Sequence, residues 1–172
     1  VLGVDEAGRG PLAGPVVAAA FVILSKRSTL FPALPSSLSA GITDSKQVPE
    51  SVREQLYYDK ILPCADVKYS VSVIDNKTID QINILQSTFL AMSEAADKLM
   101  AEIRCTDPAT TFSILIDGNK VPPQLKERGD IVCEFLIKGD ALEFVVAAAS
   151  ICAKVERDKI MHALDKEFLM YG

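Results

Sequence analysis

The sequence has few residues of the kinds that bind zinc or form disulfides. It contains one histidine and four cysteines. The cysteines at positions 64, 105, 133 and 152 are widely spaced, and no two of them form a C-x-x-C pair. This spacing argues against a zinc site and against a disulfide framework. Free thiols in a reducing compartment are expected instead, and we predict a cytoplasmic protein.

Long apolar runs and an excess of basic residues are also missing. No stretch approaches the ~20 apolar residues of a membrane span, and the first residues do not form a basic, cleavable leader, so a soluble protein with no membrane partner is expected. The net charge of −5 argues against a generic, basic nucleic-acid-binding surface. It does not exclude a metal-dependent nuclease, because a carboxylate cluster counts as negative until cations bind it.

Strand-like and helical segments alternate along the chain, with no repeat, low-complexity tract or domain boundary. The apolar patterns predict strands over residues 1–5, 16–24, 67–75, 111–116 and 131–137. Helices are predicted over residues 50–62, from residue 78 to about 99, and from 140 to about 162. Thr78 and Gln81 form a capping box in this interpretation. The chain is therefore expected to fold as one α/β domain over residues 1–172.

Acidic residues follow three of the predicted strands directly. Asp5 and Glu6 end the first, Asp117 the fourth and Asp140 the fifth. Such a cluster repels itself unless cations occupy it, and its oxygen ligands suit a pair of Mg²⁺ or Mn²⁺ ions. Neighbouring strand residues point to opposite faces, so Asp5 and Glu6 would converge only if the strand ends or bends there.

Taken singly, these acids have ordinary structural explanations. Asp117 with Gly118 is a common turn pair, and Asp140 with Glu143 makes a good helix N-cap box.

The Gly8-Arg9-Gly10 turn stands beside the first two acids. Glycine lets the backbone approach a sugar-phosphate chain closely, and Arg9 offers a bidentate phosphate contact. The alternative is a simple β-turn with a solvated arginine.

These motifs resemble those of the ribonuclease HII family, the bacterial type 2 ribonucleases H, along nearly the whole chain. The opening DEAGRGPLAGPV, from Asp5 to Val16, is similar to the long first signature of that family. DSK at residues 44–46, IDG at 116–118, KGDA at 138–141 and AAASICAKVERD at 147–158 resemble its later motifs. The resemblance implies a ribonuclease H-like fold, a central mixed β-sheet flanked by helices.

The resemblance also implies roles for residues. Asp5, Glu6, Asp117 and Asp140 would be the four metal ligands, and Gly8, Arg9 and Gly10 the loop that reads the ribonucleotide. Lys46 is a candidate phosphate contact, with a solvated loop lysine as the alternative. The implied reaction is two-metal endonucleolytic cleavage of RNA in RNA/DNA hybrids and on the 5′ side of single ribonucleotides in duplex DNA, which leaves 5′-phosphate and 3′-hydroxyl ends. A monomer is expected, and the family's C-terminal segment, with its junction-stacking tyrosine, is not in this sequence.

Other interpretations remain open on the residues alone. A related metal-dependent exonuclease or a non-catalytic phosphate-binding domain would also explain the acids and the glycine turn. Ser150, Lys154 and Arg157 share one stripe of the last predicted helix. At 1.5 Å per residue, Lys154 would lie ~21 Å from Asp140, so it is expected outside the metal site, either on duplex backbone or in a structural role.

Overall fold

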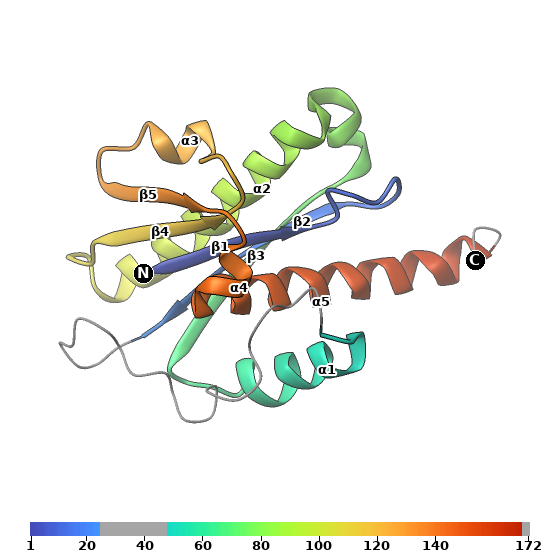
Figure 1. Ribbon diagram of the computed structural model, residues 1–172, viewed down its shortest axis with the longest axis horizontal. Coiled ribbons are helices and arrows are strands. Elements are labelled where there is room, and N and C mark those ends of the chain that lie inside the picture. Colours follow the sequence, from blue (N-terminus) through green and yellow to red (C-terminus); the bar gives the residue numbers. More distant parts are fainter. Residues whose placement is uncertain (25–47, 170–172) are drawn as a thin grey trace.

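A five-stranded mixed sheet forms the centre of the molecule (Figure 1). The computed structural model describes residues 1–24 and 48–169. The strands are β1 (Leu2–Ala7), β2 (Val16–Ile23), β3 (Val67–Ile74), β4 (Phe112–Asp117) and β5 (Ile131–Leu136), in the order β3-β2-β1-β4-β5. The β1–β2 and β2–β3 pairs are antiparallel, whereas the β1–β4 and β4–β5 pairs are parallel.

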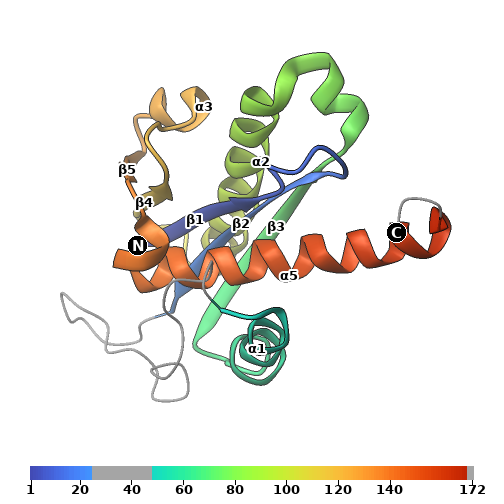
Figure 2. The same ribbon diagram turned by 45° about the vertical axis from the view of Figure 1, so that its right-hand side comes forward.

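Helices cover both faces of this sheet, as Figure 2 shows. They are α1 (Glu50–Gln55), the π-helical turn η1 (Leu56–Ile61), α2 (Asn76–Thr106), α3 (Pro123–Lys126), α4 (Gly139–Leu142) and α5 (Phe144–Glu167). The long helix α2 packs on one face, and α5 with η1 packs on the other. The predicted α/β architecture, a mixed sheet flanked by helices, is confirmed. No helix in the described ranges has the length and apolar character needed to cross a lipid bilayer.

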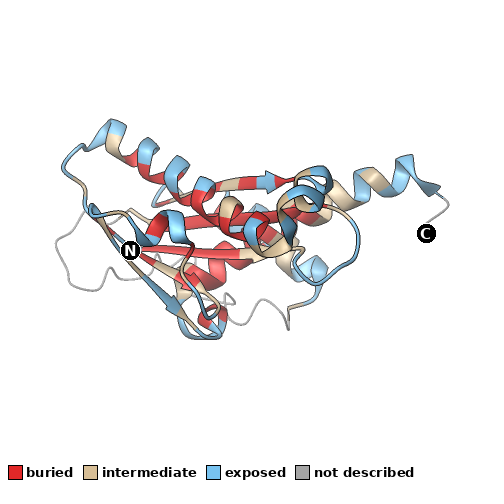
Figure 3. Cartoon of the chain, turned by 90° about the horizontal axis from the view of Figure 1, so that it is seen from above, coloured by how far each residue is buried: buried red, intermediate tan, exposed pale blue. Residues whose placement is uncertain are grey.

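Successive side chains of the central strands point alternately into two apolar layers, one on each face of the sheet. Leu2, Val4 and Ala18 face α2, while Ala19 and Phe21 face α5. Figure 3 shows the buried residues concentrated along the middle of the sheet and on the helix faces that cover it. This two-sided burial explains why β1 and β2 are nearly continuous apolar runs.

Small residues let α5 lie very close to β1. A Cβ atom at Gly3 would collide with the backbone of Val145. Farther along, the carboxyl of Asp5 meets Ser150, and Gly8 abuts Arg157. A strand advances about 3.3 Å per residue and a helix about 1.5 Å, so five strand residues span roughly the same length as twelve helix residues.

Two predicted helix starts are wrong. Asp75 caps α2, because its Oδ1 accepts a hydrogen bond from the Thr78 amide at 2.8 Å. Thr78 therefore lies inside the first turn, and the predicted Thr78–Gln81 capping box does not form. A sequence pattern cannot separate two possible cap residues three positions apart.

The helix predicted to start at Asp140 is two helices. Glu143 has extended backbone angles (φ −126°, ψ 124°) and separates α4 from α5. Asp140 lies within the short α4, and Glu143 makes no side-chain cap. The predicted Asp140–Glu143 cap box is therefore also wrong.

Candidate active site

The acids after three strands lie at one edge of the sheet. The strands β1, β4 and β5 are parallel, so their carboxyl ends point the same way. This end of the sheet carries Asp5 and Glu6 from β1, Asp117 from β4, and Asp140 shortly after β5. In α/β folds, ligands bind at such carboxyl ends. The expected placement of the acids at strand ends is thus seen in the structure.

The parallel register between β1 and β4 stops just before the acids. It runs from Leu2 to Val4 on β1, and the last β4 partner is Ile116. Asp5 and Asp117 are the next residues on the two strands, directly after the last paired residues. The first strand itself continues to Ala7, paired with β2, which corrects the expectation that it ends at Asp5.

Asp5 is a buried acid, with 2% of its surface exposed. Burial raises its pKa well above the ordinary value, and the negative charges of Glu6 and Asp117 raise it further. Two hydrogen bonds act in the opposite direction, one from the Ser150 side chain and one from the Glu6 amide to Oδ1 at 2.7 Å. The other oxygen, Oδ2, is buried and accepts no hydrogen bond from the described residues.

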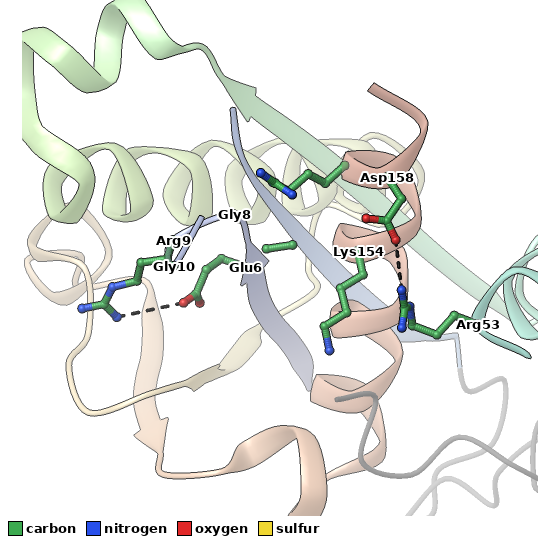
Figure 4. A pocket seen from close by; sticks show the side chains of 9 residues that line it. Glu6, Gly8, Arg9, Gly10, Arg53, Lys154 and Asp158 are labelled. Atoms are coloured by element: carbon green, nitrogen blue, oxygen red, sulfur yellow. Dashed lines mark hydrogen bonds and ion pairs between the residues drawn. The ribbon is translucent and has the colours of Figure 1, made fainter. Parts of the chain in front are cut away.

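Glu6 extends from the next position of β1 toward Arg9 (Figure 4). Its Oε1 lies 4.0 Å from Nη1 of Arg9. The Glu6 charge nevertheless acts on Asp5, so the two carboxylates are electrostatically linked although they are neighbours on a continuous strand.

The backbone that follows β5 connects Asp140 with Asp117. The Gly139 amide donates to Oδ1 of Asp117 at 2.7 Å, and the next residue, Asp140, is 3% exposed. Lys138 adopts a left-handed conformation (φ 59°), which turns the chain so that Gly139 can reach Asp117. A Cβ at Gly139 would lie close to both Val146 and Asp117.

The chemistry of these groups suits a hard divalent cation. Carboxylate oxygens are the ligands that Mg²⁺ and Mn²⁺ prefer, and a buried carboxylate oxygen with no donor is stabilised by a cation. Within the described residues, no group of three or more His, Cys, Asp or Glu side chains is arranged to hold a metal ion. Carboxylates repel one another when no cation lies between them, so the side chains would have to draw together around an ion.

The glycine turn lies beside these acids. Gly8 has a left-handed φ of 99°, which favours glycine, and a Cβ there would collide with the Pro15 carbonyl and Arg157. At Gly10 a Cβ would meet no atom of the described chain within 4 Å. Arg9 is half exposed. The loop is thus tightly packed at its base and open at Gly10.

A cavity of about 420 Å³ connects the glycine turn with α5 and α1. Its charged lining residues are Glu6, Arg9, Arg53, Lys154, Arg157 and Asp158. The four cations outnumber the two acids, so the cavity is locally basic on an acidic protein. Figure 4 shows Lys154 extending from α5 in the space between Arg53 and the strand that carries Glu6.

Lys154 lies on α5, beyond the break at Glu143, and lines the same cavity as Glu6. That cavity is not lined by Asp5, Asp117 or Asp140. The expectation that Lys154 lies outside the metal site, on duplex backbone or in a structural role, therefore stays a prediction. Lys46, the other predicted phosphate contact, lies outside the described residues.

Sequence reasoning did not assign the partners of Ser150, Arg53 and Arg157. Ser150 hydrogen-bonds Asp5, and Arg157 binds the loop after β1. Arg53 donates to the Val48 carbonyl at 2.8 Å and to Asp158 at 3.0 Å, which ties the start of α1 to α5. The sequence signals for Ser150 and Arg157 were their shared stripe on one helix and their place in the motif at residues 147–158.

Solved structures define the class of the fold as ribonuclease H-like. Ribonuclease H2 from Pyrococcus horikoshii is 29% identical, with a TM-score of 0.64 over 99% of this chain and 78% of that chain. A chain of the PCNA:RNase HII complex from Archaeoglobus fulgidus is 26% identical, with a TM-score of 0.64 over 97% of this chain and 77% of its own. Bst-RNase HIII in complex with Mn²⁺, 24% identical over 96% of this chain and 54% of its own, shares the fold with a TM-score of 0.74.

Sequence comparison narrows the class to one family. The family model for Ribonuclease HII matches residues 2–172. Ribonuclease HII of Ruminiclostridium cellulolyticum is 42% identical over 100% of this chain and 58% of its own length, and that of Francisella philomiragia is 39% identical over 100% and 80%. The chain belongs to the ribonuclease HII family. It spans little more than half the length of the first of these relatives.

Proposed function

We propose that this chain is a metal-dependent endoribonuclease that cuts RNA/DNA hybrids and cleaves on the 5′ side of single ribonucleotides in duplex DNA. The products would carry 5′-phosphate and 3′-hydroxyl ends. The observation that supports this most is the placement of acids at the carboxyl ends of three parallel strands, with Asp5 buried near the charges of Glu6 and Asp117. The four free cysteines of the chain are typical of a protein in a reducing, cytoplasmic location.

In this proposal Asp5, Glu6, Asp117 and Asp140 hold two Mg²⁺ or Mn²⁺ ions. Such ions activate a water molecule and neutralise charge on the phosphate and the departing oxygen. The protein's own contribution is to place these carboxylates at one edge of the sheet and to bury Asp5 and Asp140. Ser150 orients Asp5, and the Gly139 amide orients Asp117.

The remaining residues bind the nucleic acid. Gly8, Arg9 and Gly10 form the wall of the site that would lie against the ribose, since the open side of Gly10 permits close backbone approach. The 2′-hydroxyl is the group that distinguishes the two sugars. Lys154 and Arg53 line the cavity next to Glu6 and would contact neighbouring phosphates. Lys46 stays a candidate for the same role.

A single cleavage assay tests the function. The substrate is a labelled DNA duplex with one internal ribonucleotide, incubated with Mg²⁺ or Mn²⁺, and an all-DNA duplex is the control. One cut on the 5′ side of the ribonucleotide supports the proposal. Progressive shortening from an end would indicate an exonuclease, and binding without cleavage would indicate a phosphate-binding domain.

A further inference from the structure

Arg157 is a buried arginine whose donors are directed at the loop after β1. It lies on α5 and is 9% exposed. Its Nε donates to the Pro15 carbonyl at 3.1 Å, and its Nη2 donates to the Ala13 carbonyl at 2.8 Å. One rigid guanidinium thus fixes two carbonyls of a loop more than 140 residues away in sequence.

The two ends of this loop, at Gly8 and Gly14, pack directly against the Arg157 side chain. A Cβ at Gly8 would collide with Nε of Arg157, and a Cβ at Gly14 would press on Met161 and Nη2 of Arg157. Gly8 and Gly14 have left-handed φ values of 99° and 86°. The loop therefore leaves β1 and returns to β2 in close contact with one guanidinium.

The middle of the loop is free of such contacts. A Cβ at Gly10 would have no neighbour within 4 Å among the described residues, and Leu12 is fully exposed. Because both ends are held and the tip is open, the height of Gly10 above the site depends on how firmly the ends are held.

We propose that Arg157 is a positioning residue that sets the discrimination between ribonucleotide and deoxyribonucleotide. It would act by holding the backbone of Gly8–Gly10 at hydrogen-bonding distance from a 2′-hydroxyl, without touching the substrate itself. This inference rests on the proposed function. A hydrogen bond is lost when the heavy atoms separate beyond about 3.5 Å, and a misplacement of ~1 Å can cost ~100-fold in rate.

The test uses two variants and one control. Arg157→Met keeps most of the side-chain volume but removes all donors, whereas Arg157→Lys keeps the charge and can reach only one carbonyl. Arg128→Met is the control, because Arg128 forms ion pairs with Asp97 and Asp130 away from the loop. For each protein, affinity is measured for a duplex with one ribonucleotide and for the matching all-DNA duplex, with Ca²⁺ in place of Mg²⁺. Both affinities are measured at several salt concentrations, together with the melting temperature.

A positioning role predicts that the affinity ratio falls at least about tenfold in Arg157→Met and less in Arg157→Lys. Affinity for all-DNA duplex and the salt dependence should stay unchanged, and the ratio for Arg128→Met should equal that of the unmodified protein. The proposal is overturned if only the melting temperature falls, as in the control.

Two other outcomes would also overturn it. A parallel loss of both affinities, with a salt slope flatter by about 0.9, would make Arg157 a direct phosphate contact. Failure of both Arg157 variants to fold would make Arg157 a folding residue. An unmodified protein that does not distinguish the two duplexes would instead contradict the proposed function itself.

Discussion

At the scale of single residues, Asp5 links the chemistry of the site to the stability of the fold. Its carboxylate is desolvated and faces two other acids, and both effects disfavour its charged form. A cation would reverse this penalty, because it replaces the lost solvation and the repulsion together.

Asp5→Asn should abolish cleavage and leave the metal-free protein equally or more stable at neutral pH. Removal of a residue that only hydrogen-bonds to a metal ligand lowers activity ~10- to 100-fold. Removal of a ligand itself should lower turnover by more than that. Because the folded-state pKa of Asp5 is raised, its stabilising contribution is complete below the unfolded pKa of about 3.9 and is lost as the pH rises. The stability gain of the variant should therefore grow from pH 4 toward neutrality.

Urea unfolding at several pH values, without divalent ions, measures this gain. Asp80→Asn serves as control, since Asp80 is exposed on α2. A variant that kept near-normal turnover in saturating Mg²⁺ would remove Asp5 from the site.

Gly10→Ala tests whether the loop recognises the ribonucleotide independently of metal binding. The added methyl group meets no atom of residues 1–24 or 48–169 within 4 Å, so the melting temperature should change little. Discrimination between ribonucleotide and deoxyribonucleotide and the cleavage rate should fall, while metal affinity stays the same. Gly8→Ala is the informative contrast, because its Cβ would collide inside the protein and its φ is left-handed. Normal substrate reading with lost metal binding would make the loop only a support for Asp5 and Glu6.

Lys154→Met should weaken substrate binding and reduce the salt slope by about 0.9, the contribution of one phosphate contact. The cleavage position should not move. Filter binding at four salt concentrations gives the slope, and Lys126→Met on α3, outside the cavity lining, is the control. An unchanged slope would assign Lys154 a structural role.

The position of the four acids at one edge of the sheet could be predicted from the sequence, because each follows an apolar run and strand ends are readable from such runs. Their role as metal ligands stays a prediction. Arg157 could not be assigned, because its partners are backbone carbonyls of Ala13 and Pro15, and carbonyls leave no sequence signal. The break at Glu143 was not predicted either, because its extended backbone interrupts a run of residues whose pattern is typical of one continuous helix.

At the scale of elements, the contact between β1 and α5 is the one that positions the site. The sequence predicted both elements, but not their closeness, which depends on a glycine in a strand that otherwise favours larger residues.

Gly3→Ala should destabilise the protein by about 1–3 kcal/mol, because a buried methyl group must push α5 away from β1. Ser150 and Asp5 would separate with it, so cleavage should also decline. Gly129→Ala is the matched control, since a Cβ there meets nothing within 4 Å in the part of the chain that the structure describes. Equal urea midpoints for the two variants would contradict the close packing.

At the scale of the whole molecule, divalent ions should stabilise the folded chain. Binding to the native state at 100 times the dissociation constant adds about 2.7 kcal/mol, and each kcal/mol shifts the melting temperature of a chain of this size by roughly 2–4 °C. Mg²⁺ or Mn²⁺ should therefore raise the melting temperature by several degrees. Asp5→Asn should lose most of that rise, and NaCl at equal ionic strength should not reproduce it. Equal shifts in both proteins would place the ions elsewhere.

The paired advance of β1 and α5 also limits how this chain can change in length. Gly3 lies against Val145, Asp5 against Ser150, and Gly8 against Arg157. These contacts follow one another along both segments, so the spacing of residues in one segment must match the spacing in the other. One residue inserted into α5 between Val145 and Ser150 would rotate everything after it by about 100°. Arg157 would then swing away from the loop, and Ser150 away from Asp5. Insertions and deletions among related sequences should therefore be absent from these two segments.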